Sequence, residues 1–367
     1  MNQANHPRPK TIDVSVITTC YGRNRHLYNL LSSLANGSVQ PAEIIIVNDD
    51  ADPKRLAEYP LNIVQIPTSD SKESDLAAAS QRDLLSDNEV DAIEKTGFDI
   101  GRNRNLGAAK ASYEQLIFLD VDCIVSTTFT KQLSAKLAAH PSALLMGQPL
   151  YLTRPLTDNE SGKLQQGDWG NAELNALAVT NPYRHNLVAQ AVEQAVEQAV
   201  EQAVEQAAES TDSIELESAK ITNRAKRTIE RTQDYGAFWS LCFAISRTQF
   251  EKIGGFDTHY VGYGAEDTDF AFMARELNIE FYLTCDVIYH QQHSVYRPPL
   301  NHLSSIVVNA NRFYEKWQHW PMGGWLESFA DMQLINWQPE QQSAITITRQ
   351  PTDNEIKAAH CPDAPYV

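Results

Sequence analysis

The segment Leu116-Ile117-Phe118-Leu119-Asp120-Val121-Asp122 joins four consecutive apolar residues to two carboxylates that are one residue apart. A short, uninterrupted apolar run is typical of a strand that is buried on both faces of a parallel sheet. Ligands of open α/β sheets bind beyond the carboxyl ends of such strands, where Asp120 and Asp122 stand. Two acids with no Lys or Arg between them indicate a divalent cation held against a phosphate. A strand end with two solvated acids is the alternative, and it is the commoner origin of an isolated Asp-x-Asp triplet.

Apolar and polar segments alternate on both sides of this strand. A predicted helix with leucines at helical spacing ends at Asn36-Gly37, and the strand that follows it ends in Asn48-Asp49-Asp50. This strand-helix-strand order favours a right-handed crossover and a parallel sheet. A helix of small residues leads directly into the central strand. The predicted strands cover 14–19, 43–47, 61–66, 116–119 and 143–146, and the predicted helices cover 26–34 and 101–111.

The composition excludes several classes of protein. With 367 residues, of which 42% are hydrophobic, the chain can form one large or two smaller domains. A formal net charge of −17 repels phosphate backbones, so no nucleic-acid partner is expected. The five cysteines lack metal-ligand spacing, which favours a reducing compartment over a disulfide framework. Residues 1–10 lack the apolar core of a signal peptide, and no apolar run approaches about 18 residues. A cytoplasmic protein is therefore expected, with peripheral contact to the inner membrane left open.

Residues 151–232 are expected to form a helical insertion. Their core repeats Ala-Val-Glu-Gln over residues 191–206, and these residue types favour helix. A repeat of four on a helix of about 3.6 residues per turn drifts by about 40° per repeat, so the valines form no straight coiled-coil seam. An exposed repeat expansion is therefore favoured over a dedicated interaction helix. Three further segments are expected to be a disordered N-terminus, a polar loop with some helix, and a C-terminal tail: 1–12, 69–97 and 336–367.

A second group of informative residues lies in the C-terminal half. Residues 236–246 predict another buried strand, and the helix after it ends at Gly254-Gly255. A Gly- and aromatic-rich loop then leads to Glu266, Asp267 and Asp269 at the start of the next helix. Acids in this position commonly complement the helix dipole and cap the helix. An acid that faces a cleft can instead act as a general base.

Two histidines follow the last predicted strand segments. The apolar stretches 280–283 and 287–288 precede His290 and His293. A single histidine is usually structural. Two that are three residues apart after a strand, in a chain that already offers two acids, favour a metal-ligand role.

These parts, taken in order, resemble the GT-A glycosyltransferases, and specifically the family 2 enzymes whose C-terminal half is similar to a galactosyltransferase domain. Four blocks carry the resemblance: 14–23, 44–50, 101–122, and 236–269 with His290. The resemblance implies an α/β fold of the GT-A, Rossmann-like type, with a mostly parallel central sheet flanked by helices and an inserted helical segment. The nucleotide-sugar-binding half would be 13–150, and the acceptor-binding and catalytic half would be 233–335.

The resemblance also implies roles for individual residues. Asp120 and Asp122 would bind Mn²⁺ or Mg²⁺ and grip the diphosphate of a nucleotide sugar, and His290 would complete the metal shell. Asp267 would be the catalytic base and Glu266 an acceptor contact. The uracil and ribose would be held by Thr18, Tyr21, Arg23 and Asp49, and the rest of the donor site would be lined by Arg102 and Asn105.

Two motifs depart from the family pattern. The usual Asp-Asp-Gly-Ser is replaced by Asn48-Asp49-Asp50-Ala51, which leaves open which acid contacts uracil. The common Trp-Gly-Gly is replaced by Tyr263-Gly264-Ala265, which weakens any inference about the acceptor.

The resemblance implies a metal-dependent, inverting transferase that moves galactose, GalNAc or a similar sugar from a UDP-sugar. The acceptor would be a glycan, a lipid-linked glycan or another hydroxyl compound, in surface polysaccharide biosynthesis. A carboxylate base assists the weakly nucleophilic hydroxyl, and one base opposite the leaving group implies inversion, as in inverting glycosidases. Two alternatives stay open: a module that adds sugars repeatedly, and a non-catalytic nucleotide-sugar-binding or scaffold protein that uses the insertion for partner contact.

Overall fold

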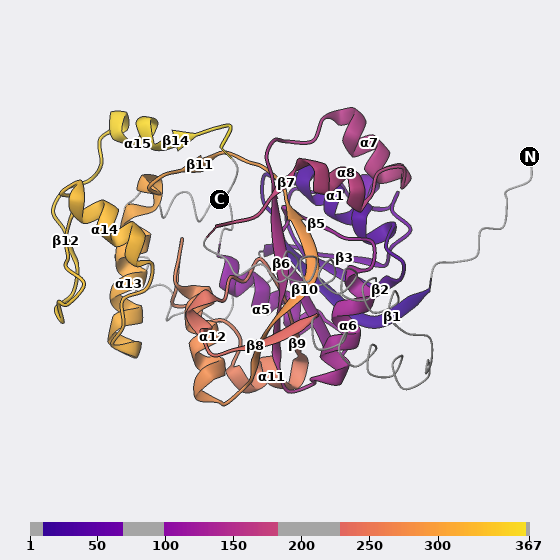
Figure 1. The fold of residues 1–367 in the computed structure, drawn as a ribbon, viewed down its shortest axis with the longest axis horizontal. Helices are drawn as coiled ribbons and strands as arrows, with labels where there is room; N and C mark the ends of the chain where they lie inside the picture. Colours follow the sequence, from indigo (N-terminus) through magenta and orange to yellow (C-terminus); the bar gives the residue numbers. More distant parts are fainter. Residues whose placement is uncertain (1–9, 69–98, 183–227, 365–367) are drawn as a thin grey trace, which may run out of the picture.

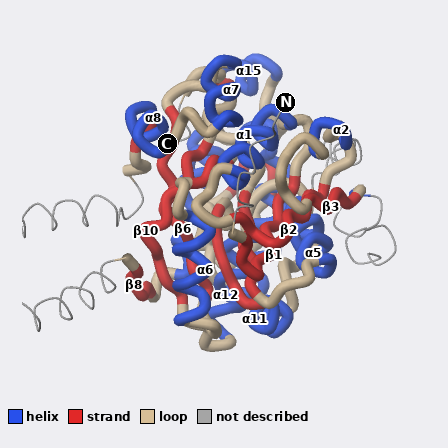
Figure 2. The backbone as a smooth tube through the Cα atoms, turned by 90° about the vertical axis from the view of Figure 1, so that its right-hand side faces the viewer, coloured by secondary structure: helices blue, strands red, loops and turns tan. Residues whose placement is uncertain are grey.

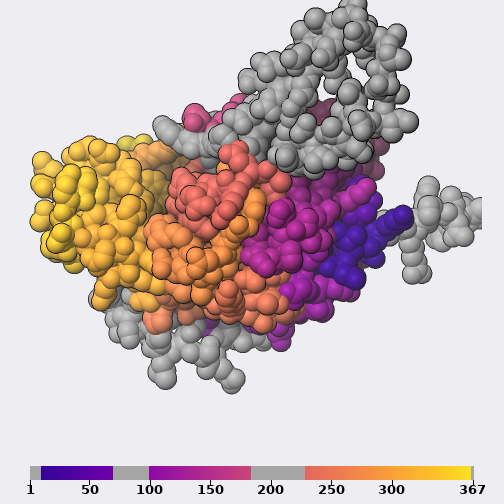
Figure 3. Space-filling view, turned by 60° about the horizontal axis from the view of Figure 1, so that its bottom comes forward, coloured from indigo at the N-terminus to yellow at the C-terminus, as the bar shows by residue number. Residues whose placement is uncertain are grey.

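The computed structural model describes residues 10–68, 99–182 and 228–364 (Figure 1). The expected loop at 69–97, the Ala-Val-Glu-Gln repeat and most of the expected N-terminal segment 1–12 lie outside these residues. Within them, a central sheet is packed between helices, and a smaller C-terminal lobe lies at the opposite end of the molecule from the N-terminal strands (Figures 1 and 3). None of the helices in these ranges is long and apolar enough to cross a membrane.

The strands of the central sheet are β1 (Thr11–Thr19), β2 (Gln40–Val47), β3 (Ile63–Ile66), β4 (Gln115–Leu119), β5 (Cys123–Val125), β6 (Leu144–Leu152), β7 (Ala178–Val179), β8 (Ile229–Thr232), β9 (Cys242–Ser246) and β10 (Phe281–His290). Two small pairs in the C-terminal lobe are formed by β11 (Val295–Tyr296) with β14 (His360–Cys361) and by β12 (Ile335–Asn336) with β13 (Thr346–Ile347).

The helices are α1 (Asn24–Ala35), α2 (Pro53–Leu56), α5 (Ile100–Lys110), α6 (Phe129–Ala139), α7 (Asp158–Gln166), α8 (Asn171–Leu177), α11 (Arg247–Ile253), α12 (Glu266–Glu276), α13 (Leu303–Trp317), α14 (Gly323–Asp331) and α15 (Asp353–Ala359). Two short 3₁₀ helices are η2 (Tyr235–Ala237) and η3 (Leu300–His302).

The sheet has the order β3-β2-β1-β4-β9-β6-β10-β5, with β7 beside β6 and β8 beside β10. Strands β3, β2, β1 and β4 are parallel to one another, whereas β9 is antiparallel to both of its neighbours, β4 and β6. Strand β10 is parallel to β6, so six of the ten strands point the same way. The expected α/β fold with a mostly parallel central sheet flanked by helices is therefore confirmed.

The side chains of β4 alternate between two cores, which explains its uninterrupted apolar sequence. Ile117 and Leu119 belong to the core under α1 and α6, and Leu116 and Phe118 belong to the core under α5, α11 and α12. The ring of Phe118 stacks on that of Phe243 in β9, with 4.4 Å between centroids. Each face of the strand thus buries apolar surface against a helical layer, which is the condition for a two-sided parallel strand.

Two strands differ in length from the sequence prediction. The strand expected from residue 236 begins only at Cys242, because its partner β4 ends at Leu119, opposite Cys242, and η2 replaces the first residues. The two apolar stretches expected at 280–283 and 287–288 are one strand, β10, whose register with β6 shifts between Leu283 and Val287. A bulge therefore joins what the sequence pattern separates.

The C-terminal lobe has an apolar core of its own. Helix α13 packs Leu303, Ile306 and Ala310 into this core, and α14 adds Leu326 and Phe329. The segment 335–361 closes this lobe, because Trp337, Ile345 and Ala359 belong to the same apolar cluster as α13 and α14.

We expect Gly107→Ala to destabilise the fold. A Cβ atom at Gly107 would lie 2.5 Å from Cγ2 of Ile17, a methyl group of the core strand β1, so α5 would have to move away from the sheet. Overpacking of this kind costs about 1–3 kcal/mol in the free energy of unfolding, which urea denaturation measures.

Gly162→Ala is the matched control, since Gly162 also lies inside a helix, α7, but has no atom within 4 Å of the added Cβ. There alanine should be neutral or stabilising by up to about 1 kcal/mol. Equal effects of the two substitutions would contradict the close packing of α5 on β1.

Candidate functional site

The carboxyl end of β4 turns sharply, and the turn separates its two acids. The backbone N–H of Asp120 donates to Leu241 O at 2.9 Å, and that of Cys123 donates to Asp120 O at 3.0 Å. Strand β5 then begins at Cys123 and pairs with β10, with Cys123 opposite His290. Asp122 is thereby carried to the end of β10, while Asp120 stays beside β9 and α5.

Asp122, His290 and His293 form a cluster that can hold a metal ion. The ligand atoms that these residues offer all lie within 4.8 Å of one another. His290 Nε2 lies 3.5 Å from one carboxylate oxygen of Asp122, and His293 Nε2 lies 3.3 Å from the other. Arg23, from the start of α1, also reaches this carboxylate at 2.6 Å.

The protonation states of this cluster suit metal binding. Burial opposes ionisation of Asp122, but His290, His293 and Arg23 together hold its pKa well below the usual range. Burial lowers the pKa of His290 to about 4, so its imidazole is neutral at pH 7. An ionised carboxylate and a neutral imidazole are the forms that coordinate metal ions, so these residues fit a divalent cation.

Asp120 has a different partner. Nη2 of Arg104, from α5, lies 2.7 Å from its carboxylate, and this arginine side chain is only 4% exposed. Nη1 of Arg104 lies 3.7 Å from Oε1 of Glu266 at the start of α12. Burial raises the pKa of Asp120, and the guanidinium of Arg104 opposes that shift. A buried cation therefore lies between the acid that ends β4 and an acid of the C-terminal half.

Arg104 was not among the residues expected at the site, whereas Arg102 was. The two arginines point about 160° apart on a helix, and the sequence does not show which of them faces inward. One signal was present: Gly107, three residues after Arg104, is on the same side of α5 and packs closely on β1. The small residue marks the helix face that approaches the sheet, and Arg104 shares that face.

The other expected donor-site residues lie at the ends of β1 and β2. Thr18 is buried, and its Oγ1 has no hydrogen-bond partner within the described ranges. Tyr21 is 40% exposed in the loop after β1. Asp49 accepts a hydrogen bond from Thr68 N at 2.7 Å, whereas Asp50 accepts one from Gly22 N at 3.0 Å. Of these two acids, it is therefore Asp50 that contacts the loop after β1.

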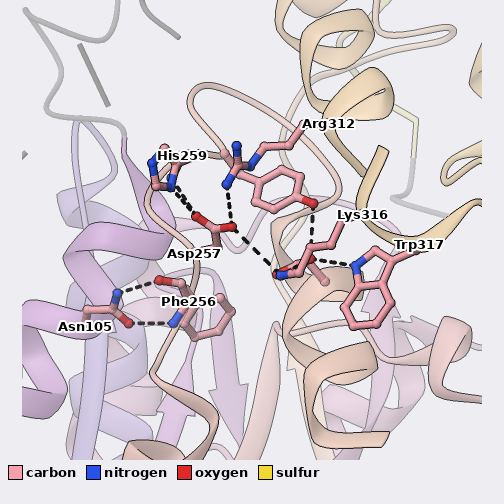
Figure 4. Close-up of polar contacts among 9 residues, drawn as sticks. Asn105, Phe256, Asp257, His259, Arg312, Lys316 and Trp317 are labelled. Carbon is pink, nitrogen blue, oxygen red and sulfur yellow. Dashed lines mark hydrogen bonds and ion pairs between the residues drawn. The ribbon is translucent and has the colours of Figure 1, made fainter. Parts of the chain in front are cut away.

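Asn105 positions the neighbouring loop. Its side-chain amide donates to Phe256 O at 2.8 Å and accepts from Phe256 N at 2.8 Å (Figure 4). This pair of bonds ties α5 to the segment that leads into α12. Asn105 thus acts on the loop that carries the acids, and the expected donor contact stays a prediction.

The three acids at the start of α12 have different surroundings. Asp269 is buried and receives hydrogen bonds from Tyr260, Lys316 and Trp317, so it joins the loop before α12 to α13 (Figure 4). Asp267 accepts a hydrogen bond from Thr268 N at 2.7 Å. Of the three acids within this turn, Asp269 is therefore a structural anchor, and the roles expected for Glu266 and Asp267 stay predictions.

The pKa values of the two remaining acids are raised. Burial, reinforced by the charge of Asp267, raises the pKa of Glu266 to about 8. Burial also raises the pKa of Asp267, against the hydrogen bond from the Thr268 backbone. Adjacent carboxyl groups with raised pKa values are typical of acid–base sites.

A second acid fixes the loop that precedes α12. Asp257 binds Arg312 of α13 at 2.8 Å and the ring nitrogen Nδ1 of His259 at 2.7 Å (Figure 4). The loop needs this support because Gly264 and Ala265 have positive φ angles of 96° and 74°. Left-handed backbone at a non-glycine residue persists only where surrounding contacts impose it.

Two family models match the chain. Residues 15–184 match glycosyl transferase family 2, and residues 222–294 match the N-terminal domain of galactosyltransferase. The first match contains Arg104, Asp120 and Asp122, and the second contains the acids of α12 and both histidines. No curated protein has a sequence that matches the chain significantly.

Solved structures resemble the chain distantly. S. aureus TarS has 14% identity and a TM-score of 0.42, over 83% of this chain and 40% of that one. GalNAc-T7 with UDP, GalNAc and Mn²⁺ has 14% identity and a TM-score of 0.40, over 76% of this chain and 42% of that one. The chain thus spans less than half the length of either protein. Likeness at this level identifies neither a donor nor an acceptor.

The raised pKa of Glu266 predicts a pH-dependent effect of Glu266→Gln on stability. Between the unfolded pKa of about 4.3 and the folded pKa of about 8, the unfolded chain has released this proton and the folded chain has kept it. The stability of the wild type therefore falls as pH rises through this window. Glutamine cannot ionise, so the variant lacks this loss of stability. The melting temperature of the variant minus that of the wild type should therefore increase between about pH 5 and about pH 8.

Thermal unfolding in metal-free buffer measures this difference. Glu327→Gln, on the exposed surface of α14, is the control and should show no such trend. If the difference in melting temperature between Glu266→Gln and the wild type stays constant with pH, the buried, protonated state of Glu266 is contradicted.

Proposed function

We propose that this chain, a glycosyltransferase with a family 2 domain and a galactosyltransferase-like segment, moves a sugar from a UDP-sugar to a hydroxyl group of a glycan acceptor. One observation carries the proposal, which is that two sets of contacts meet after β4. Asp122 clusters with His290 and His293. Asp120, two residues earlier, pairs with Arg104, which also reaches Glu266. A cation site and a pair of acids with raised pKa values are the two parts that such a transfer requires.

The metal would be held by Asp122, His290 and His293. In this proposal His293 takes the place expected for Asp120, whose carboxylate is paired with Arg104. Mg²⁺ prefers oxygen ligands, whereas imidazole is a ligand of transition metals, so two histidines favour Mn²⁺ over Mg²⁺. A divalent cation bound there would neutralise negative charge on the departing diphosphate.

The donor nucleotide would lie over the ends of β1 and β2. Thr18, Tyr21, Arg23 and the acids after β2 surround that edge, and the guanidinium of Arg23 is within reach of Asp122. Arginine there can bind a phosphate through paired hydrogen bonds. Asp120 would hold the donor beside the metal site.

Asp267 would remove the proton of the acceptor hydroxyl. The attack would come from the side opposite the diphosphate, which inverts the configuration at the sugar carbon. With a pKa of about 8, Glu266 carries its proton at neutral pH and can donate a hydrogen bond to an acceptor oxygen. The galactosyltransferase-like segment supports galactose, GalNAc or a similar sugar as the transferred group. A role in surface polysaccharide synthesis, in the cytoplasm with peripheral contact to the inner membrane, belongs to the same proposal.

UDP binding should depend on the metal. Titration calorimetry should give the tightest UDP binding with Mn²⁺, weaker binding with Mg²⁺ and the weakest with a chelator. His293→Ala removes one ligand and should weaken Mn²⁺-dependent binding by about tenfold or more, since even outer-shell partners of metal ligands are worth that much. His319→Ala, on the exposed surface of the C-terminal lobe, is the control. Equal UDP affinity with Mn²⁺ and with chelator would contradict the proposed role of a metal ion in donor binding.

Asp267→Asn should lower transfer by about 10²–10⁴-fold, the usual worth of a positioned base, because the amide keeps the size of the side chain and loses its basicity. UDP affinity should change little. Release of UDP from a panel of nucleotide sugars, with and without acceptor, measures the loss.

Two results would redirect this assignment. If Asp267→Asn stays active and Glu266→Gln is inactive, Glu266 is the base. If both variants stay active, or if no nucleotide sugar yields UDP with the wild type, the non-catalytic binding or scaffold role becomes the better account.

A further inference from the structure

The loop that leads into α12 has an unusual backbone. Gly262, Gly264 and Ala265 have positive φ angles of 81°, 96° and 74°. Glycine adopts such angles without strain, whereas the Cβ atom of Ala265 makes them unfavourable. Ala265 is also the N-cap residue of α12, and its carbonyl oxygen accepts a helical hydrogen bond from Asp269 N at 2.9 Å. The backbone angles at Ala265 therefore set the direction in which α12 begins, with Glu266 as its first residue.

One side chain of α13 binds the carbonyl groups that precede these three residues. Nδ2 of Asn309 donates to Val261 O at 3.1 Å, to Tyr263 O at 3.3 Å and to Gly264 O at 3.0 Å. Each of these carbonyls belongs to the peptide group immediately before a residue with a positive φ angle. Asn309 is only 1% exposed, so water does not compete for these hydrogen bonds. The three acceptors also identify the bonded atom as nitrogen, because an amide oxygen there would be repelled by all three carbonyls.

The planarity of the peptide group connects these hydrogen bonds to the φ angles. A carbonyl oxygen and the N–H of the next residue lie in one plane and turn together. If φ of Ala265 changed sign while α12 stayed in place, Gly264 O would therefore swing away from Asn309. The same holds for the peptide groups before Gly262 and Gly264. The amide of Asn309 thus opposes relaxation of the loop to ordinary backbone angles, which is the kind of surrounding contact that strained backbone requires.

The acids of the site directly follow this loop. Helix α12 packs beside α11 (Figures 1 and 2), and its apolar side chains belong to the core on that face of the sheet. Its first turn carries Glu266 and Asp267, and Glu266 Oε1 lies 3.7 Å from Nη1 of Arg104. Because Glu266 is bonded to Ala265, a change in the backbone angles at Ala265 would turn the first-turn acids away from their present positions.

We propose that Asn309 is a positioning residue: its amide imposes the left-handed backbone of the loop before α12 and thereby orients Glu266 and Asp267. The inference rests on the proposed transferase function for the role of the two acids. It adds a residue of the C-terminal lobe to the site, outside both of the ranges that match family models, 15–184 and 222–294.

Hydrogen exchange followed by mass spectrometry tests the loop without reference to catalysis. Asn309→Ala removes all three hydrogen bonds and should speed the exchange of backbone amides in peptides that cover 258–270, including the N–H of Asp269. Wild-type exchange in this variant overturns the inference. Circular dichroism identifies a variant that fails to fold, in which case Asn309→Ser, whose hydroxyl can still donate one hydrogen bond, decides the matter by a smaller increase in the same peptides.

Asn311→Ala is the matched control. Asn311 lies on the same helix and also binds backbone groups, since it donates to Ile345 O at 3.0 Å and accepts from Ile345 N at 2.7 Å. Its loss disturbs the C-terminal lobe and leaves the loop before α12 untouched. The exchange of 258–270 should therefore equal that of the wild type.

A glycine at position 265 gives a test that a merely structural role of Asn309 would not pass. Glycine adopts a positive φ angle without support, so adding Ala265→Gly to Asn309→Ala should restore much of the lost protection against exchange and much of the lost transfer. If the double variant is as impaired as Asn309→Ala alone, the amide does not act through the backbone angle of Ala265, and the inference is overturned.

Kinetics give the third measurement. Asn309→Ala should lower kcat by about 10–100-fold, because small misplacements of catalytic groups have effects of this size. The KM for the nucleotide sugar and the affinity for UDP with Mn²⁺ should change little, since the proposed metal ligands Asp122, His290 and His293 lie at the end of β10 and not on this loop. Asn311→Ala should retain the kcat of the wild type.

The outcomes separate this inference from the proposed function. Absence of UDP release from every nucleotide sugar contradicts the transferase, and the exchange measurements with the glycine rescue still decide whether Asn309 imposes the loop conformation. UDP release with a wild-type kcat in Asn309→Ala, although exchange of the loop is faster, overturns the positioning role and leaves the transferase standing. An equal fall in kcat for Asn309→Ala and Asn311→Ala also overturns it.

Discussion

The guanidinium of Arg104 joins the two halves of this molecule at one buried point. It lies between Asp120, at the end of β4, and Glu266, at the start of α12, and it stacks over the ring of Phe256 at 5.1 Å. Buried carboxylates are costly unless a charge of opposite sign accompanies them. Arg104 therefore pairs at one place with an acid from residues 13–150 and an acid from residues 233–335.

A second set of charged side chains, of which Asp269 is buried, holds the start of α12 in place. Asp257 and Asp269 both bind residues of α13, so the loop between them is fastened at each end to the C-terminal lobe (Figure 4). The C-terminal lobe therefore contributes to the site, since its helix α13 positions the loop that precedes α12. Loops that carry catalytic residues are normally positioned by a rigid scaffold, and here that scaffold includes α13.

Much of the fold followed from patterns that act locally. The apolar run of β4, the leucine spacing of α1 and the alternation of strands and helices each reflect burial at a short period, and the structure confirms the mostly parallel sheet that they indicate. The antiparallel course of β9, between β4 and β6, had no local signal. Strand direction within a sheet depends on which neighbours are available, and those lie far away in the sequence.

The residue types of the site were also visible in sequence, but their partners were not. Asp120, Asp122, Glu266, Asp267 and His290 stood out by their position after strands or at a helix start, which is local information. Two features depended on distant packing: His293 joins the cluster around Asp122, and Arg104 pairs with Asp120. Whether a side chain points into a site is a matter of helix rotation and strand register to within one residue. Those are set by the close contact of Gly107 with Ile17 and by the pairing of His290 with Cys123, which only the folded chain brings together.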